Sequence, residues 1–368
     1  MHIRTLLQNV RKARGLSAAE LAKRVEVSRQ TIYAIEDGSF VPNTAVALRL
    51  ARVLDVSVEE IFALDRTSET GTLKAELLTR ASGDTEDGQL VRLCQVNERL
   101  LAVPVPGLSM YLPAADGTIT GKSGSRVSVT PAADVLQNGK RLLVAGCDPA
   151  LSLLAEALVS SGIEMIGVPC GSRRALEYLK QGRVHAAGSH LRDSATGDYN
   201  VPLIKGLFPR GGVRIVTFAV WEQGLVLRRG NPRNIRSISD LADKQAILIN
   251  REKGSGSRDL LDKGLRKAGV AAKALAGYDN LANGHLSAAY AVATGNADCC
   301  VATRSAARRF GLDFVPLAVE RFDLTFSKPS LELPGVKAAL DLINRASLKR
   351  KLETIAGYDT AHTGDVLM

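Results

Sequence analysis

Long apolar runs are missing from this chain of 368 residues, and none approaches the roughly 18 residues that a membrane-spanning helix needs. The first residues, Met1–Arg4, also lack the charged region, apolar core and small-residue cleavage site of a secretory signal. The sequence therefore predicts a cytoplasmic protein that makes no contact with a membrane.

Cysteine is scarce as well, with five residues: Cys94, Cys147, Cys170, Cys299 and Cys300. Their number is odd and no two show the C-x-x-C spacing, so neither a disulfide framework nor a zinc site is indicated. Reduced thiols are expected. Cys147 and Cys170 both end predicted strands, which leaves thiol sensing or soft-metal binding open as an alternative.

The motifs of common enzyme classes are absent too. No Walker spacing of glycines followed by Lys and Ser/Thr occurs, and no dinucleotide-binding G-x-G-x-x-G follows a predicted strand. No nucleophile with a neighbouring base, paired catalytic carboxylates or metal-ligand cluster stands out, although residues far apart in sequence could meet in space. The sequence therefore predicts that the protein is not an enzyme and uses no cofactor or metal.

Length and composition indicate several domains. Hydrophobic residues make up 45% and charged residues 23% of the chain, which is typical of globular proteins, and 368 residues exceed one ordinary core. We expect three parts, at residues 1–64, 65–140 and 141–368. The formal net charge of +10 fits an anionic partner without identifying one.

Residues 1–64 have the pattern of five short helices. Ser17 with Glu20 and Ser57 with Glu60 form capping boxes, in which each serine and glutamate satisfy backbone donors at a helix start. Ser28 and Asn43 are further helix-starting residues. Helical spacing places Ile3, Leu6, Leu7 and Val10 on one face of the first helix and turns Ile32 and Ile35 inward on the third.

The second and third helices are joined by a tight turn, which is the helix-turn-helix pattern for the DNA major groove. The third helix exposes residues suited to base edges and phosphates: Ser28, Arg29, Gln30, Thr31 and Tyr33. The segment "LSAAELAKRVEVSRQTIYAIEDGSFVPNTAVALRLARVLDVSVEEIF" closely resembles the phage repressor and Cro-like (XRE) family. The resemblance implies a homodimer on palindromic double-stranded DNA operators, with Ser17, Asp37 and Ser39 as further candidate DNA contacts. A helical interaction module that has lost DNA binding is the alternative.

Residues 65–140 predict linkers and a small antiparallel β module. Val91–Val96 and Arg99–Val105 have the pattern of a hairpin, and Gly117–Thr120 and Arg126–Thr130 of further strands. No catalytic constellation appears among them. We expect this module to couple the two ends of the chain.

From residue 141 onward, strand and helix patterns alternate, which predicts a parallel α/β sheet. Strands 142–145, 165–168 and 184–188 end in small or polar residues, and helix N-termini such as the one predicted at Asp148 and Pro149 suit an anion. A predicted strand at 246–249 is followed in the same way by a glycine-containing loop at 250–258, which leads into another helix N-terminus suited to an anion. The long strand 213–227, which carries Glu222 and Gln223, is expected to cross between two lobes and act as a hinge.

Segments such as "VAGCDPALSLLAEAL", "GSRRALEYLKQGRVHAAGSHLRD", "FAVWEQGLVLRRGNP" and "NREKGSGSRDLLD" resemble the PBP-like domain related to periplasmic molybdate-binding proteins, over about residues 141–362. The resemblance implies a two-lobed, type II periplasmic-binding-protein-like α/β domain that binds a small oxyanion through hydroxyls and backbone amides. The positions that match the family's binding loops are Ser172, Ser189, Ser255 and Ser257, with the backbone amides near Asp148–Leu151. The further candidate ligand contacts are Asp148, Pro149, Ala150, Gly171, Arg173, His190, Gly256, Arg258 and Asp298. For His190 the alternative is a cap at the strand end, and for Asp298 it is a residue that caps or orients a loop. Asp148 departs from the pattern, since Ser or Thr would be more favourable beside a dianion, and Arg173, Arg258 or Arg304 could compensate.

Three functional hypotheses remain open at this point. The first is a one-component transcriptional regulator controlled by molybdate or tungstate. The second keeps the regulator but replaces the anion with an organic carboxylate or pterin-like ligand, with Asp148 and Arg258 as contacts. The third is an enzyme of molybdenum cofactor handling. Ser172 and Ser257 also suit helix starts whether or not a ligand binds, and His185 is expected to be structural.

Overall fold

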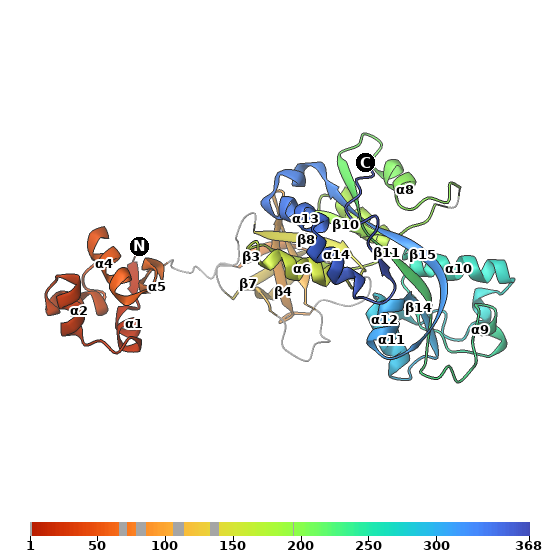
Figure 1. Cartoon of the computed structure of the whole chain (residues 1–368), viewed down its shortest axis with the longest axis horizontal. Coiled ribbons are helices and arrows are strands. Elements are labelled where there is room, and N and C mark those ends of the chain that lie inside the picture. The colour runs from red at the N-terminus through yellow and green to blue at the C-terminus, as the bar shows by residue number, and fades with distance from the viewer. Residues whose placement is uncertain (1, 66–71, 79–85, 106–113, 133–139, 194) are drawn as a thin grey trace. The chain divides into compact units, whose positions relative to one another are not determined.

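The computed structural model describes residues 2–65, 72–78, 86–105, 114–132, 140–193 and 195–368. The chain divides into two compact units, Met1–Gly71 and Thr72–Met368 (Figure 1). Among the described residues, no helix combines the length and apolar character needed to cross a membrane.

The first unit contains the five predicted helices: α1 (Leu7–Ala13), α2 (Ala18–Val25), α3 (Arg29–Glu36), α4 (Thr44–Leu54) and α5 (Val58–Ile61). The four predicted capping residues, Ser17, Ser28, Asn43 and Ser57, are confirmed, and both capping boxes are complete. The helices enclose an apolar core in which Ile32 and Ile35 are fully buried, as predicted.

The start of this unit differs from the prediction. Ile3 lies in strand β1 (His2–Thr5), which pairs antiparallel with β2 (Phe62–Asp65), so it is not part of the first helix. Strand β1 ends at Thr5, and α1 begins only at Leu7. The two ends of the unit are therefore joined to each other, and the amphipathic pattern alone could not show this because pairing depends on residues about 60 positions away.

The second unit begins with a closed barrel in the order β3 (Leu73–Leu77), β5 (Arg99–Pro104), β4 (Leu90–Val96), β6 (Gly117–Ser123) and β7 (Arg126–Pro131). The predicted strands are confirmed, but the module is not purely antiparallel, because β3 and β5 run parallel. Closure through this pair removes the free sheet edges that an open module of this size would expose.

The barrel is fixed to the sheet that follows it. Its outward-facing Cys94, Val96 and Leu101 are buried in one core with residues of the α/β sheet. Asp116 accepts hydrogen bonds from Arg92 at 3.1 Å and from Arg141, at the start of the sheet, at 2.7 Å. Burial raises the pKa of Asp116, but the hydrogen bonds from Arg141 and from the backbone of Leu93 outweigh it and the pKa is lowered overall.

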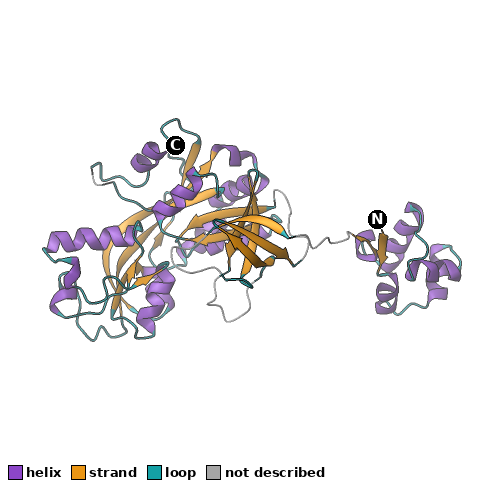
Figure 2. Ribbon diagram, turned by 180° about the vertical axis from the view of Figure 1, so that it is seen from behind, coloured by secondary structure: helices purple, strands orange, loops and turns teal. Residues whose placement is uncertain are grey.

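A seven-stranded mixed sheet forms the rest of the unit, in the order β14 (Cys299–Thr303), β11 (Val213–Leu227), β15 (Asp313–Ser327), β10 (Ala186–Ser189), β8 (Arg141–Gly146) and β9 (Glu164–Pro169), with β16 (Tyr358–Asp359) on β11. At the β8 end, alternate residues face opposite cores. Leu142 and Val144 pack under α6 (Leu151–Val159), α13 (Pro334–Asn344) and α14 (Ala346–Glu353). Leu143 and Ala145 face α7 (Ser172–Lys180), α8 (Val201–Leu207) and the barrel, so helices cover both faces of this lobe (Figure 2).

The second lobe has its own cores around β14, with α9 (Asp240–Asp243), α10 (Gly256–Ala268), α11 (His285–Ala293), α12 (Arg304–Arg309) and the short strands β12 (Asn250–Arg251) and β13 (Leu281–Ala282). The predicted strand at 246–249 is wrong, since Leu248 makes only an isolated bridge and the regular pairing starts at Asn250. Cys299 and Cys300 face different cores, as expected for neighbours in a strand.

Two long antiparallel strands connect the lobes. β11 is the predicted crossing strand, and its partner β15 is a second crossing that the sequence did not predict. The pair runs from Val213 opposite Ser327 in the first lobe to Leu227 opposite Asp313 in the second, with register shifts near Thr217 and Gln223. Such a two-strand connection is suited to a hinge.

Candidate functional site

The DNA-facing residues predicted on α3 lie together at the surface. Ser28, Arg29, Gln30 and Tyr33 are exposed and Thr31 is half-buried. The guanidinium of Arg29 lies over the Tyr33 ring and donates to its hydroxyl at 2.8 Å. Gln30 makes no hydrogen bond to another described side chain, so its amide is free to reach a base edge.

The other three predicted DNA contacts are engaged in local structure. Ser17 is held in its capping box, and Asp37 accepts a 2.9 Å hydrogen bond from the backbone of Ser39. The hydrogen bonds from Ser39 lower the pKa of Asp37. All three residues are exposed; a serine hydroxyl can donate to a phosphate, whereas the ionised carboxylate of Asp37 would repel one.

A buried ion pair connects α3 to α1. Arg11 on α1 donates to Glu36 at the end of α3 at 2.5 Å and 3.0 Å, and to the backbone carbonyl of Leu16 at 2.9 Å. Both side chains are almost fully buried, at 9% and 4% exposed. Sequence patterns gave no sign of this pair because its members lie on different helices 25 residues apart.

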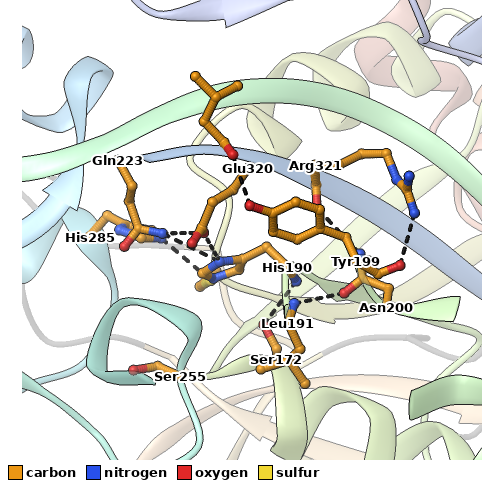
Figure 3. Close-up of polar contacts among 12 residues, drawn as sticks. Ser172, His190, Leu191, Tyr199, Asn200, Gln223, Ser255, His285, Glu320 and Arg321 are labelled. Atoms are coloured by element: carbon orange, nitrogen blue, oxygen red, sulfur yellow. Dashed lines mark hydrogen bonds and ion pairs between the residues drawn. The ribbon is translucent and has the colours of Figure 1, made fainter. Parts of the chain in front are cut away.

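In the second unit, the ends of several elements meet between the two lobes (Figure 3). We call this place the seam; it lies where His190 and Gly171 of the first lobe face Gly256 and Ser255 of the second. A β-carbon built on Gly256, at the start of α10, would lie 2.4 Å from the His190 ring at the end of β10. One built on Gly171, ahead of α7, would lie 3.3 Å from Ser255. Glycine at both positions therefore permits the two lobes to approach each other closely.

His190 is the centre of the hydrogen bonds at this seam. Its Nδ1 lies 2.7 Å from Glu320 on β15, and the Gln223 amide on β11 donates to the same carboxylate. Its backbone N–H donates to Ser172 at 3.2 Å. Burial lowers the pKa of His190, but Cys147 and Glu320 outweigh it and raise the pKa to about 10, so this position favours positive charge.

Cys147, in the loop after β8, lies between two imidazoles. Its sulfur is 3.4 Å from Nε2 of His190 and 3.6 Å from Nε2 of His285, the first residue of α11. All three side chains are buried, and their ligand atoms lie within 4.8 Å of one another. Burial, followed by the charges of Arg251 and His190, holds the pKa of His285 well below its usual range.

The sequence raised soft-metal binding for Cys147 with Cys170 and a ligand contact for His190, but it did not predict that Cys147, His190 and His285 come together. The two histidines stand 43 and 138 positions from Cys147, a spacing that matches no metal or catalytic motif. In chemical terms the thiol and two imidazoles could hold a metal ion. The series Cys147, His190 and Glu320 also resembles the order of a nucleophile, base and orienting carboxylate.

The four predicted serines lie on elements that meet at this seam, but they differ in how they are used. Ser255 starts α10 by accepting from the Arg258 N–H, whereas Ser172 is the first residue of α7 and accepts from His190. The prediction that Ser172 and Ser257 cap these helices is therefore wrong, since Gly171 and Ser255 occupy the N-cap positions. The hydroxyls of Ser189 and Ser257 are buried without a hydrogen bond to any described residue.

Asp148, Pro149 and Ala150 form a turn ahead of α6. The helix begins at Leu151 with no side-chain cap, so the prediction that Asp148 caps it is wrong. Instead, one oxygen of Asp148 accepts from the Ala150 N–H at 2.8 Å and from the Tyr358 hydroxyl, while the other has no partner among the described residues. Burial raises the pKa of Asp148 to about 6, which makes a neutral carboxyl easier to reach here than at the surface.

The predicted charged residues are spread more widely. Arg173 is exposed and pairs with Asp259 at 3.4 Å. Arg258 is buried, donates to the Arg251 carbonyl at 3.1 Å and lies over the Tyr278 ring. Two others are held elsewhere, with Asp298 paired to Arg228 and Arg233 and bonded to the Ile247 N–H, and Arg304 paired to Glu222. None of the contacts described for these last two is with the seam serines or His190.

Two cavities adjoin the seam. One of about 280 Å³ is lined by residues that include Gly171, Arg174, Lys253 and Arg258. Another of about 290 Å³ is lined by residues that include Arg173, His190, Gly256 and Glu320. Each draws residues from both lobes, so a ligand in either would contact both.

Known proteins match both units. The helix-turn-helix family model matches residues 7–61, and the model described as the PBP superfamily domain matches residues 155–344. The uncharacterized protein YvgK of Bacillus subtilis (strain 168) is 32% identical over 228 residues, which cover 62% of this chain and 73% of YvgK. An uncharacterized HTH-type transcriptional regulator of Methanothermobacter thermautotrophicus is 48% identical over 64 residues, covering 17% of this chain and 93% of that protein.

Among solved structures, a putative phosphate ABC transporter substrate-binding protein from Clostridium perfringens with bound phosphate aligns with a TM-score of 0.45 at 14% identity, over 58% of this chain and 97% of that chain. At this level of similarity its ligand does not transfer to the present protein. The two family matches do establish the architecture. The chain belongs to the family defined by the PBP superfamily domain, and it carries an XRE-type helix-turn-helix domain at its N-terminus.

Proposed function

We propose that this protein is a transcriptional regulator that binds operator DNA through α3 and changes its DNA affinity when a small anion binds between the two lobes. The main support for an anionic ligand comes from two buried hydroxyls, those of Ser189 and Ser257, which make no hydrogen bond to a described residue. Leaving a buried hydroxyl without a partner costs roughly 1–3 kcal/mol. A ligand that accepts hydrogen bonds would remove this penalty.

The surroundings of these hydroxyls support an anion over a neutral ligand. Ser257 lies in the first turn of α10, a helix of 13 residues, and Ser189 precedes His190 at the end of β10. Free backbone N–H groups and the positive end of the helix dipole favour negative charge at such a position. The guanidinium of Arg251 is buried at the same seam, paired to Glu252 at 3.0 Å.

The hinge strands provide a mechanism. An anion that contacts both lobes prefers the closed form, so binding shifts the population toward closure about β11 and β15. The barrel shares a core with the first lobe, so closure moves the second lobe relative to the barrel. In a homodimer on a palindromic operator, such movement would change how well the two DNA-binding units fit their half-sites.

An organic acid is a second candidate, favoured by the cavity of about 280 Å³ that Arg258 lines. This volume exceeds what a tetrahedral oxyanion requires and approaches the lower end, about 300 Å³, of sites for larger ligands. Arg174 and Lys253 would supply further positive charge to a carboxylate there.

Titration calorimetry of the full chain tests the proposal. The protein, stripped of bound ligand, is titrated with molybdate, tungstate, sulfate and phosphate, followed by a set of small dicarboxylates. We expect saturable binding of one of these anions and its loss in Ser257→Asp, which adds negative charge at the buried hydroxyl. Ser152→Asp, on an exposed position of α6, is the matched control and should bind as the parent does.

Two outcomes would contradict the proposal. If no anion binds, the ligand is not of this class. If Ser257→Asp binds as tightly as Ser152→Asp, the anion does not sit at the seam.

A further inference from the structure

We propose that Cys147, His190 and His285 bind one borderline transition-metal dication, with Zn²⁺ as the leading candidate. The inference goes beyond the proposed function and does not depend on an anion. It starts from the distances of 3.4 Å and 3.6 Å between the Cys147 sulfur and the Nε2 atoms of the two histidines.

These distances match those of a zinc site. With Zn–S near 2.3 Å and Zn–N near 2.0–2.1 Å, a tetrahedral ion holds its sulfur and nitrogen ligands about 3.5 Å apart. The sulfur thus already lies at a suitable distance from each nitrogen, and small rotations of the imidazoles would bring the two nitrogens, which lie within 4.8 Å of each other, into the same geometry. A thiolate with two imidazoles is also the donor set that favours zinc or copper over magnesium or calcium.

The position of Glu320 is a second, independent observation. Metal-binding histidines usually place their other ring nitrogen against a carboxylate or carbonyl, which fixes the ring orientation. Nδ1 of His190 has this partner, Glu320 at 2.7 Å, and its Nε2 faces the Cys147 sulfur. Trp221 packs against both imidazoles, at 4.9 Å and 5.4 Å between ring centroids, and further restrains them.

The local charges fit a dication. A thiolate at Cys147 and the Glu320 carboxylate would balance two positive charges, which a buried site requires. Arg251 interacts with Cys147 as well as with Glu252, to which its guanidinium is paired at 3.0 Å and 3.1 Å. The nitrogen Nδ1 of His285 has no partner among the described residues, so an ordered water could complete its hydrogen bonding.

A catalytic cysteine explains the cluster less well. A thiol nucleophile needs one imidazole as its base, yet here two imidazoles direct the same nitrogen, Nε2, toward one sulfur. Cys147 is also only 6% exposed in this structure, where a substrate could not reach it. Two nitrogens around one sulfur are what a metal site requires.

The site would also act on the hinge. Cys147 and His190 belong to the first lobe, whereas His285 begins α11 in the second. A metal ion bound by all three would therefore join the lobes and stabilise the closed form. Three protein ligands leave a fourth position of a tetrahedral ion open to water or to an anion.

Cobalt absorption on the full chain tests the proposal, because Co²⁺ replaces Zn²⁺ and reports its ligands. The metal-free, reduced protein in chloride buffer without any oxyanion is titrated with Co²⁺ and then with Zn²⁺. We expect one equivalent of Co²⁺ to produce a sulfur-to-cobalt charge-transfer band with intense tetrahedral d–d bands, and Zn²⁺ to displace it. The absence of other anions keeps this result separate from the fate of the proposed function.

Four variants complete the test. Cys147→Ser should lose the charge-transfer band, while Cys170→Ser, which removes the neighbouring thiol, should keep it. His285→Gln should weaken binding and lose the Zn²⁺-dependent rise in Tm. Glu320→Gln should lower metal affinity about 10- to 100-fold while the circular dichroism stays unchanged.

The proposal is overturned if the parent shows no charge-transfer band. It is equally overturned if the band persists in Cys147→Ser or if His285→Gln binds the metal as tightly as the parent. Should Cys147→Ser fail to fold, His285→Gln and Glu320→Gln decide the matter by their affinities.

Discussion

Replacing Gly256 by Ala should open the two lobes. The added β-carbon would lie 2.4 Å from the His190 ring and 2.7 Å from its backbone oxygen, whereas ordinary contact begins near 3.4 Å. The start of α10 must therefore move by about 1 Å, the difference between 3.4 and 2.4 Å. The ring cannot yield easily, because Glu320 bonds it and Trp221 packs against it.

The size of the effect follows from the packing conflict. Inserting a methyl group into a well-packed site costs about 1–3 kcal/mol. Opening the hinge relieves the conflict, so the ratio of open to closed molecules should rise about 5- to 150-fold, since 1.4 kcal/mol corresponds to a factor of ten.

The thiol of Cys147 reports this opening because it is only 6% exposed where the lobes meet in this structure. If the lobes open and close quickly, the rate of labelling by a thiol reagent is proportional to the open population. We expect the labelling of Cys147, identified by mass spectrometry, to be about 5- to 150-fold faster in Gly256→Ala. Cys300, buried within the second lobe, serves as an internal reference and should not change.

Gly206→Ala is the matched control, since Gly206 lies in α8 with no atom within 4 Å of the position of a β-carbon. It should label as the parent does. Equal rates in Gly256→Ala and Gly206→Ala would refute the reasoning, because the lobes would then not meet at His190.

Three further changes probe the rest of the molecule. Arg11→Ala leaves Glu36 buried without its partner and should lower the free energy of unfolding of the first unit by about 3–5 kcal/mol. Arg49→Ala, which breaks an exposed ion pair, should lower it by less than about 1 kcal/mol. Equal losses for the two variants in urea unfolding would contradict this. Burial lowers the pKa of His185 to about 4, so between pH 7 and pH 5 only the unfolded chain takes up a proton at this residue. The free energy of unfolding should therefore fall by about 2 kcal/mol more in the parent than in His185→Gln over this range. Urea unfolding curves that shift equally in both proteins between the two pH values would exclude this effect. Gln30→Ala should relax the preference at one base pair by about 1–3 kcal/mol in DNA selection from a random pool, and an unchanged preference would remove Gln30 from the base contacts.

Local signals in the sequence were sufficient for the helices of the first unit. A serine followed by a glutamate three residues later satisfies backbone donors within one turn, so Ser17 and Ser57 identify helix starts without knowledge of the fold. The same holds for the face of α3. The Asp148 turn shows the limit, because the carboxylate bonds to Ala150 as a cap would, but the helix begins at Leu151, two residues later than a cap at Asp148 predicts.

Features that depend on distant residues could not be predicted in this way. The parallel pairing that closes the barrel, the second hinge strand and the buried pair of Arg11 and Glu36 all join segments with no shared local pattern. The cluster at the seam is the clearest case. Cys147 and His285 meet only because strand and helix ends of both lobes converge, so no spacing rule could find them.

The proposed function requires coupling between the lobes and the DNA-binding unit, and operator binding in the presence of each anion measures that coupling most directly. Fluorescence anisotropy of the full chain with a DNA selected from a random pool would be recorded without ligand and with molybdate, tungstate, sulfate or phosphate. We predict that one anion changes the operator Kd by about 5- to 150-fold and that Ser257→Asp abolishes the change. An operator Kd that none of the four anions alters would contradict the central claim.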